Sequence, residues 1–594
     1  MIKDFFSDVL YCLCISFKTS IFYTIIRILL QIIKALLPIV SVYILKLILD
    51  VLASGEEDNY LMRKFIAFII IYLIIHVLNQ WTSKLNEYIK KIHDEKLSNH
   101  LNLIIINKSS KMDLKYFDSP NYYDKMKLLR VNSNAINQIV WNLVDCIGQI
   151  FTFIATFAIL VHYNSFYSFA IVLSYLPIAI CDQIYIRKLY DWQIRNIGHE
   201  RKYEYIASLV TQRIHAKEIR IFGIADYLVT IYKSLWESWF SKKNMIIKKW
   251  SLITMSISIV PQLLTVFILL QVGKAIIYGN SSIGDFSFYS GIIGQLVASI
   301  FLIILSLSNI SENKIRIRDF RDFSGWTSSF ENSGDLELQS IDNIRFCNVS
   351  FIYPGNENAT IKNMSFEIKA RERVALVGIN GAGKTTLVKL LLRFYDVTEG
   401  HILFNGIDIK RFTQASIRRF FSVMFQDYSN YAFTLRDNIA LSDINTPTND
   451  NKVIEACQKS GIDVIYKDWE KGLDSYISKE FEMDGKVLSG GDNQKIALGR
   501  TFYRDAEIII LDEPSSALDP ESEYKLFNKM LELCMNKGVI LISHRLSNVM
   551  ITERIIVIES GELIEQGSHS ELIKKNGRYA ALFRYQAERY KEKC

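Results

Sequence analysis

The sequence predicts a multi-domain chain in which an all-α transmembrane domain of six helices is followed by an α/β domain. Up to about residue 320 the chain is crowded with Ile, Leu and Phe, whereas the remainder alternates short apolar runs with glycine clusters and turns. At 594 residues, half of them hydrophobic but 22% charged, the chain is longer than one hydrophobic core organises. We expect an interfacial elbow helix at 1–18, the membrane domain at 19–325 and the α/β domain at 340–594.

Six apolar segments are long enough to cross a bilayer, which takes about 20 residues in a helix. They lie near 21–50, 61–80, 137–162, 166–186, 251–278 and 286–310. The residues before the first span mix Phe and Leu with Lys and Asp, a pattern typical of an amphipathic helix in the membrane interface. The N-terminus lacks a cleavage site, so we expect no signal peptide.

The distribution of basic residues predicts the orientation of the spans. Lys and Arg are concentrated in 84–130 and 187–249, whereas the short connections 53–60, 163–165 and 279–285 contain none. Basic loops stay on the cytoplasmic side, so we expect a multi-pass protein of the cytoplasmic membrane with both termini and the α/β domain inside. Both basic segments look helical and extend the spans into the cytoplasm. At their turning points we expect short transverse helices, at 119–126 and 206–216.

The composition of the chain limits the classes of partner that we expect. The net charge of +7 is compatible with a membrane surface or a nucleic acid. The polar half shows no compact basic stripe with interleaved aromatics, so we expect no nucleic-acid partner. The eight cysteines are scattered, and Cys12 and Cys14 lack zinc-site spacing, so free thiols in a reducing compartment are expected.

The α/β domain contains a phosphate-binding loop in the context that this motif requires. A buried-strand pattern at 373–377 enters a GxxxxGK[ST] sequence, and an apolar helix follows at 387–394. The glycines let backbone N–H groups point at phosphate oxygens, and the helix N-terminus adds positive potential. Lys384 is expected to reach the β- and γ-phosphates and the Thr385 hydroxyl to bind Mg²⁺. The loop consists of Gly378, Ile379, Asn380, Gly381, Ala382, Gly383, Lys384, Thr385 and Thr386.

A second apolar strand, 508–511, ends in two carboxylates. Asp512 is expected to hold Mg²⁺, and Glu513 to polarise the attacking water as general base. These two motifs fit many nucleotide hydrolases. A third motif narrows the choice among these hydrolases. It is Leu488-Ser489-Gly490-Gly491, some 100 residues after the loop and 20 before Glu513.

With this signature the chain resembles the ABC ATPase family over essentially its whole length, as a type IV exporter with fused membrane and ATPase domains. The resemblance implies ATP and Mg²⁺ as cofactors, with Ser489, Gly490 and Gly491 closing over ATP bound to the opposite subunit. It therefore implies a dimer, either with a second copy or with a related half-transporter. Asp492 departs from the usual Gln, and we expect its carboxylate to face away from the nucleotide.

Further positions resemble residues of the same family. Tyr353 is similar to its adenine-stacking aromatic, and Gln426 to the glutamine that senses Mg²⁺ and the membrane domain. Ser516–Asp519 looks like the D-loop. His544 looks like the switch histidine that contacts the γ-phosphate, so Glu513 and His544 are the expected catalytic pair.

The identity of the transported molecule is the part of the function that the sequence leaves undetermined. The segments 114–124, 217–223 and 490–495 resemble bacterial exporters of ribosomally made peptides such as lantibiotics, and the implied mechanism is ATP-driven export by alternating access. No domain precedes the elbow helix, so we expect no leader-cleaving peptidase. The alternatives are export of a lipid or hydrophobic drug, or an ATP-gated regulator or channel.

Several polar residues fall inside the spans. Arg27, Gln31 and Lys34 share one helix face, and they either line a cavity that attracts polar cargo or reach toward the inner interface. His76 and Asp145 are either pathway residues or interhelix hydrogen-bond partners. The sequence leaves both pairs of alternatives open.

Overall fold

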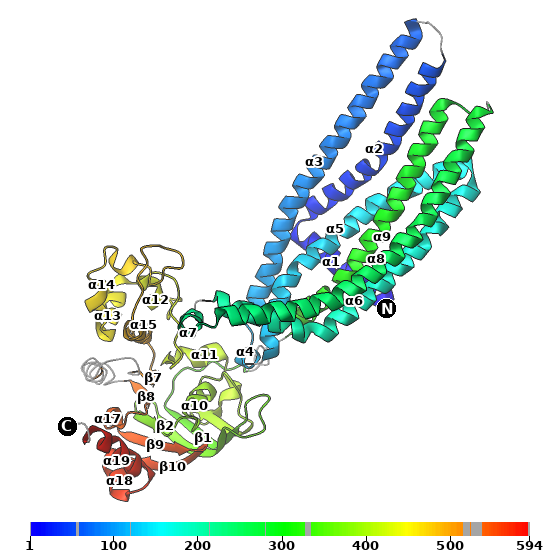
Figure 1. Ribbon diagram of the computed structural model, residues 1–594. Helices are drawn as coiled ribbons and strands as arrows, with labels where there is room; N and C mark the ends of the chain where they lie inside the picture. Colours follow the sequence, from blue (N-terminus) through cyan, green and yellow to red (C-terminus); the bar gives the residue numbers. More distant parts are fainter. Residues whose placement is uncertain are drawn as a thin grey trace. The chain divides into compact units, whose positions relative to one another are not determined.

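A computed structural model of the chain describes residues 2–54, 59–118, 120–212, 214–278, 281–326, 334–514, 523 and 537–591. It divides into two compact units (Figure 1), Met1–Lys111 with Asn121–Trp326, and Met112–Pro120 with Thr327–Cys594. The first unit is helical, and the second is built on two β-sheets.

Six long helices of the first unit are long and apolar enough to cross a membrane, which confirms the six expected spans. The second longest of them, α3, has 52 residues. At about 1.5 Å of rise per residue it is about 78 Å long, far more than a bilayer core of about 30 Å. The helices therefore extend well beyond the apolar layer. The first unit contains α1 (Ile2–Thr19), α2 (Ile21–Ala53), α3 (Asn59–Ser110), α5 (Pro120–Tyr163), α6 (Ser165–Thr211), α7 (Ala216–Ile221), α8 (Ala225–Ile277) and α9 (Ile283–Gly325).

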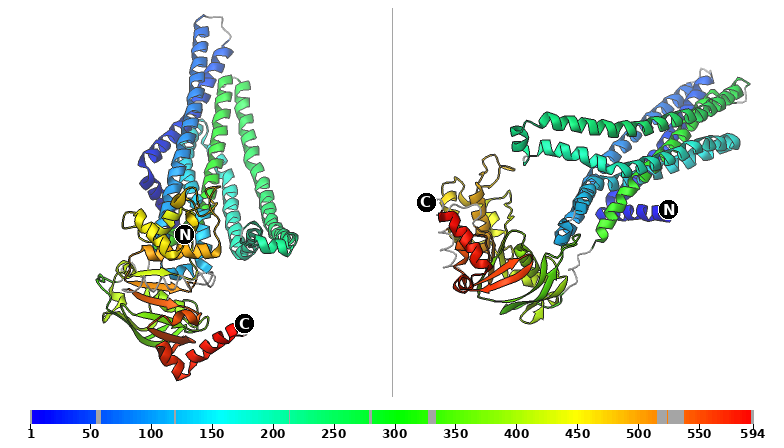
Figure 2. Two further views of the ribbon diagram at one scale, coloured as in Figure 1. Left: turned by 90° about the vertical axis from the view of Figure 1, so that its left-hand side faces the viewer. Right: turned by 60° about the horizontal axis from the view of Figure 1, so that its bottom comes forward.

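Within this unit α6 and α8 lie side by side and are joined through α7 (Figure 2), while α2 packs against both α3 and α9. The start of α9 is fixed by a capping box, in which Ser282 and Asp285 exchange hydrogen bonds. Asp285 also pairs with Lys46 of α2 at 2.6 Å. These contacts bring α2 and α9 together, and both helices line a polar cavity of about 210 Å³ whose wall includes Gln31 and Lys34.

The short transverse helices do not lie where the sequence placed them. α5 begins at Pro120 and runs without a break through 121–126, because proline is well tolerated in the first turn of a helix. α6 continues through 206–211 and ends only at Thr211, since nothing in that stretch breaks a helix. The short helices are instead α4 (Leu114–Phe117) and α7. Ser119 lies outside the described residues.

The second unit contains a six-stranded sheet of order β10-β9-β3-β8-β7-β6 and a four-stranded antiparallel sheet of order β2-β1-β4-β5. In the six-stranded sheet all neighbours are parallel except the edge strand β10. The strands are β1 (Asn343–Phe351), β2 (Ile361–Lys369), β3 (Arg373–Val377), β4 (Glu399–Phe404), β5 (Ile407–Asp408), β6 (Phe421–Met424), β7 (Ile508–Asp512), β8 (Gly538–Ile542), β9 (Arg554–Glu559) and β10 (Glu562–Gly567).

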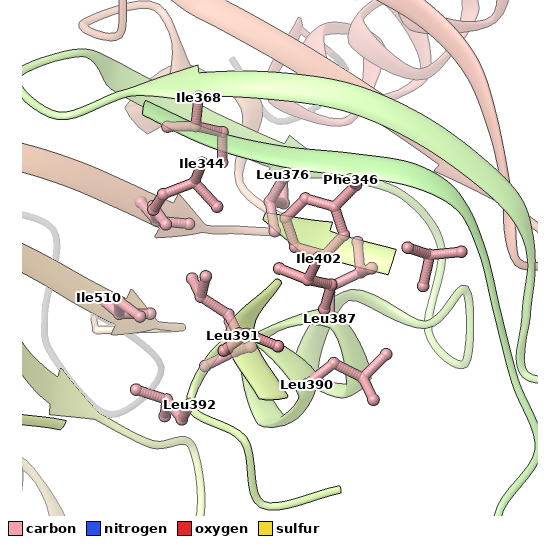
Figure 3. Packing of buried hydrophobic residues seen from close by; sticks show 14 of the residues in the cluster. Ile344, Phe346, Ile368, Leu376, Leu387, Leu390, Leu391, Leu392, Ile402 and Ile510 are labelled. Carbon is pink, nitrogen blue, oxygen red and sulfur yellow. The ribbon is translucent and has the colours of Figure 1, made fainter. Parts of the chain in front are cut away.

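The described α-helices of this unit are α4, α10 (Lys384–Leu391), α11 (Gln414–Arg419), α12 (Leu435–Ala440), α13 (Asp450–Ser460), α14 (Asp463–Tyr466), α15 (Gly490–Tyr503), α17 (Leu546–Val549), α18 (His569–Lys575) and α19 (Arg578–Lys591). Of these, α12–α14 pack with α15 in a helical cluster (Figure 1). The main core joins both sheets to α10: Figure 3 shows Leu387 and Leu391 of α10 among Phe346 of β1 and Ile510 of β7. A packed core on this scale holds the first turn of α10 rigidly, and that turn carries the phosphate-binding residues.

Candidate nucleotide-binding and hydrolysis site

The phosphate-binding loop spans the gap between β3 and α10. Gly381 and Gly383 have φ values of 79° and 103°, in the left-handed region that favours glycine. A Cβ at Gly383 would also stand 2.5 Å from the Cδ1 of Ile361, and one at Gly378 would stand 2.2 Å from the carbonyl oxygen of Ile558. Gly383 is thus required by both close packing and backbone conformation, Gly378 by close packing and Gly381 by backbone conformation.

Lys384 arches back over this loop. Its Nζ donates to the carbonyl oxygens of Gly378, at 2.9 Å, and Ile379, at 3.0 Å. Burial lowers the pKa of the ammonium group, and the carboxylates of Glu513 and Asp512 act in the opposite direction. The cation is therefore held at the mouth of the loop by carbonyl groups that a phosphate can replace as hydrogen-bond acceptor.

The carboxyl ends of neighbouring parallel strands meet at one edge of a sheet, and this brings the second motif to the loop. Asp512 is the last residue of β7 and is 1% exposed. Its Oδ2 accepts a hydrogen bond from Thr385 Oγ1 at 2.8 Å. Burial raises the pKa of Asp512, and the hydrogen bond from Thr385 lowers it by a smaller amount.

The donor chemistry at this point fits a magnesium ion. A hydroxyl and a carboxylate separated by one hydrogen bond are the hard oxygen ligands that Mg²⁺ prefers, completed by phosphate oxygens and water. Within the described part of the chain, no group of three or more His, Cys, Asp or Glu side chains could hold a metal ion. The residues that would hold Mg²⁺ are Thr385 and Asp512, which already contact each other.

Glu513 receives two side chains from loops that follow other strands. Gln426 Nε2 donates to its Oε2 at 3.0 Å, and His544 Nδ1 lies 3.1 Å from its Oε1. Glu513 has φ 51°, an uncommon conformation for a residue other than glycine. Its N–H holds that conformation by donating to the carbonyl oxygen of Ile542 at 2.9 Å. Glu513, Gln426 and His544, expected as general base, sensor and switch, therefore form one cluster.

The signature residues begin a helix. Ser489 is the N-cap of α15, and its Oγ accepts from the backbone N–H of Asp492 at 3.2 Å. The same hydroxyl donates to Asp492 Oδ2 at 2.6 Å, and Lys495 Nζ lies 3.5 Å from Oδ1. The Asp492 carboxylate thus contacts the signature hydroxyl directly, and its direction relative to a bound nucleotide stays a prediction. Among the described residues, no hydrogen bond links 489–491 to the loop 378–386.

Tyr353 lies beside the phosphate loop. Its hydroxyl is 3.1 Å from Thr386 Oγ1, and its ring makes edge-to-face contacts with Phe351 and Tyr395 at centroid distances of 4.9 and 5.3 Å. The ring is partly buried. Adenine stacking on Tyr353 stays a prediction, and the expected D-loop at Ser516–Asp519 lies outside the described residues.

The sequence analysis did not identify three residues that hold parts of this site in place. Gln494, fully buried in α15, donates to the backbone carbonyl of Glu513 at 3.3 Å, and Tyr428 donates its hydroxyl proton to the carbonyl of Gly490 at 3.2 Å. Gln586 of α19 binds the His544 carbonyl and accepts from Leu546 N–H at 2.8 Å. Gln494 stands three residues after the signature and could have been found there. Gln586 is 42 residues from His544 and leaves no local signal.

Two family models match the chain, one described as the ABC transporter transmembrane region over residues 24–300 and one described as ABC transporter over residues 361–516. Two relatives match nearly the whole length. The subtilin transport ATP-binding protein SpaT of Bacillus subtilis is 31% identical over 95% of this chain and 91% of its own. The nisin transport ATP-binding protein NisT of Lactococcus lactis subsp. lactis is 28% identical over 96% of this chain and 94% of its own.

Two further comparisons are partial or structural. An ATP-dependent lipid A-core flippase of Salmonella typhimurium is 39% identical, but over 43% of this chain and 41% of its own. Among solved structures, a bacterial Atm1-family ABC exporter with ATP bound matches with a TM-score of 0.79 and 22% identity, over 94% of this chain and 98% of that one. At that identity the match concerns the fold alone.

Proposed function

Because this chain belongs to the ABC exporters with fused transmembrane and ATPase domains, we propose that it exports a ribosomally made peptide or peptide-like natural product. The ATPase domain binds and hydrolyses ATP, and hydrolysis drives transport through a multi-pass membrane domain of six helices. The observation that carries the cargo proposal is the full-length similarity to proteins whose names state transport of subtilin and of nisin. Cargo recognition resides in the membrane half, so similarity over both halves carries more weight than similarity over part of the chain.

At the nucleotide site we assign the following roles. Lys384 leaves the carbonyls of Gly378 and Ile379 and donates to the β- and γ-phosphates, while the loop N–H groups bind the remaining phosphate oxygens. Thr385, Asp512 and Gln426 would hold Mg²⁺, which would supply positive charge next to the phosphates. Tyr353 stacks on adenine.

Glu513 accepts a proton from the attacking water as general base, and the contacts from Gln426 and His544 hold its carboxylate in place. His544 donates to the γ-phosphate when ATP is bound. Glu513→Gln keeps the size and shape of the side chain but cannot take the proton, so we expect bound ATP, no turnover and a trapped closed state. Retained hydrolysis would show that the base is another group.

We propose that the working unit is a dimer, formed with a second copy or with a related half-transporter. Ser489, Gly490 and Gly491 share no hydrogen bond with the phosphate loop among the described residues of one chain, as expected for groups that close over ATP held by a partner subunit. Glu513 and His544 are both present, so two identical copies would provide two competent sites. The native mass of purified protein, measured with and without ATP, tests this proposal.

We place both termini and the ATPase domain in the cytoplasm, from the basic segments 84–130 and 187–249. Residues 1–18 form the elbow helix, 19–325 the membrane domain and 340–594 the nucleotide-binding domain. The short helices α4 and α7 transmit nucleotide-driven motion to the spans. α4 belongs to the second unit, where Leu114 packs against the main core and Asp118 accepts a hydrogen bond from Tyr395. Cycles of ATP binding and release then alternate the access of the membrane domain.

ATPase activity in lipid nanodiscs tests the cargo. We expect nisin or subtilin to stimulate hydrolysis, and purified protein in proteoliposomes to accumulate the stimulating peptide against a gradient with ATP. The partial similarity to a lipid flippase favours a lipid or hydrophobic drug as the second candidate. Stimulation by a panel of lipids and drugs, with none by peptides, would favour that candidate, and ATP-dependent flux that never exceeds equilibrium would indicate a gated channel.

A further inference from the structure

The C-terminal helix α19 contacts the loop that carries His544 through one carboxamide side chain, Gln586. Its Nε2 donates to the carbonyl oxygen of His544, and its Oε1 accepts from the backbone N–H of Leu546 at 2.8 Å. The amide thus binds the main chain on both sides of Arg545, from a helix 42 and 40 residues further along the chain. A planar group bound at two points fixes the orientation of its partner as well as its distance.

α19 is anchored well enough to support this loop. Tyr579, Leu582, Phe583 and Gln586 follow one another at helical spacing (i, i+3, i+4, i+7), so they lie on one face of α19. Tyr579 is fully buried, and Leu582 and Phe583 pack against the same core cluster of β3, β9 and α17 (Figure 1). The first N–H groups of α19 donate to the carboxylate of Glu565 at 2.8 and 3.0 Å. The core therefore holds the face that carries Gln586.

The loop between β8 and α17 depends on Gln586 because its own sequence offers few substitutes. α17 has four residues, and its N-cap, Arg545, provides no side-chain hydrogen bond. The N–H of Leu546 has no partner within so short a helix, so Gln586 takes the place of an N-cap side chain. The Ser543 hydroxyl accepts from the Arg545 N–H at 3.0 Å and donates to its carbonyl at 3.1 Å. Among the described residues, Gln586 alone forms a side-chain hydrogen bond with the His544 backbone.

This restraint matters because the imidazole of His544 is not held by burial. The side chain is 48% exposed, and its Nδ1 lies 3.1 Å from Glu513 Oε1. An exposed pair of this kind contributes little by itself, since both side chains lose conformational freedom when it forms. A main chain that is already fixed removes part of that entropic cost. The imidazole then stays beside Glu513, where its proposed contact with the γ-phosphate requires it.

We propose that Gln586 is a positioning residue for ATP hydrolysis, which holds the main chain of this loop and thereby orients the His544 imidazole. The inference rests on the role proposed for His544, and it adds the C-terminal helix α19 to the parts of the hydrolytic site. ADP lacks the γ-phosphate that His544 would contact. Loss of Gln586 should therefore affect turnover of ATP and leave the affinity for ADP unchanged.

Gln586→Met tests this inference, because methionine has a similar length and suits a helix but offers neither hydrogen bond. We expect the ATPase kcat of the full-length protein in nanodiscs to fall about five- to tenfold, as the loss of two hydrogen bonds implies. The Kd of ADP should stay within about twofold of the wild-type value. Gln586→Glu keeps the acceptor for the Leu546 N–H but lacks the donor for the His544 carbonyl, so its kcat should fall at least as far. The matched control is Tyr585→Met at the exposed neighbouring position of α19, which should keep the wild-type kcat.

A double-mutant cycle with His544→Ala separates positioning from a general structural role. Because Gln586 acts through the imidazole, Gln586→Met should change the residual single-turnover rate of His544→Ala by less than about twofold. An equal five- to tenfold loss in both backgrounds would overturn the inference. So would a wild-type kcat in Gln586→Met when His544→Ala is impaired, and in that case the role of His544 stands. Unchanged hydrolysis in His544→Ala overturns both. If Gln586→Met does not fold, Gln586→Glu takes its place in the cycle, with the same outcomes.

Discussion

Asp492 carries the most specific prediction for the ATPase cycle, because its carboxylate contacts the signature serine. Its Oδ2 is 2.6 Å from Ser489 Oγ. If Ser489 donates to a γ-phosphate oxygen at about 2.7 Å, the carboxylate stands about 5 Å from the phosphate. Asp492 then both repels the nucleotide and competes with it for the serine proton.

The size of the effect follows from Coulomb's law. Two unit charges about 5 Å apart repel by about 0.8 kcal/mol in water and about 3 kcal/mol at an effective dielectric constant of about 20. Lys495 lies 3.5 Å from Asp492 and cancels much of this. A net repulsion of about 0.5–1 kcal/mol remains, so Asp492→Asn should lower the ATP concentration for half-maximal hydrolysis about two- to fivefold.

Steady-state ATPase activity at low and high salt checks this prediction. Lys495→Met removes the compensating cation and should shift the half-maximal ATP concentration the opposite way. Both shifts should shrink in 1 M salt, where the Debye length falls to about 3 Å. Since an acidic residue in the first turn stabilises a helix, Asp492→Asn should also lower the thermal stability slightly. An unchanged or increased ATP requirement in Asp492→Asn would refute the assigned geometry.

Three further predictions concern the second unit. Tyr395→Phe removes the hydrogen bond to Asp118 and should reduce cargo stimulation of the ATPase severalfold at unchanged basal rate; equal loss of both would argue against a transmitting role. Burial raises the pKa of Asp512, so the ionised carboxylate destabilises the fold above that pKa. Asp512→Asn should therefore raise the Tm at neutral pH while abolishing hydrolysis. A Tm difference between variant and wild type that persists well below pH 4 would contradict this sign. Gly383→Ala should lower the free energy of unfolding by about 2 kcal/mol or more, because the added methyl group both clashes and strains the backbone. The control is Gly406→Ala, where φ is 82° and the space is open, and it should cost only about 1 kcal/mol. Equal denaturation midpoints for the two variants would disprove the clash.

The sequence sufficed for the phosphate loop because its chemistry is local. Gly378 to Thr386 form a continuous run, and the flanking strand and helix have their own periodicities. The position of Glu513 could be predicted because it directly follows a buried strand. That Gln426 and His544 both touch Glu513 depends on the strand order, which brings residues 87 and 31 positions away to one edge of the sheet and which no local pattern encodes.

Other expectations needed tertiary information. The transverse helices were misplaced because Pro120 suits either a short helix or the first turn of a long one, and sequence cannot choose between them. That Asp492 faces away from the nucleotide stays a prediction. Its position three residues after an N-cap serine, which directs an acidic side chain back to the cap, was available in the sequence and would have predicted the contact with Ser489.

The two halves of the chain therefore encode their polar clusters differently. The ATPase site is assembled around contiguous motifs whose residues have few substitutes. The polar network of the membrane domain joins Arg27 on α2, Asn86 on α3 and Asp145 on α5, which are 59 and 118 residues from Arg27. Removing Asp145 would take an ion-pair partner from the buried Arg27, and because the Asp145 side chain is 37% exposed, the loss should be smaller than the roughly 3–5 kcal/mol of a fully buried pair. The polar groups of the membrane domain are thus brought together from segments distant in sequence, and no local motif encodes their arrangement.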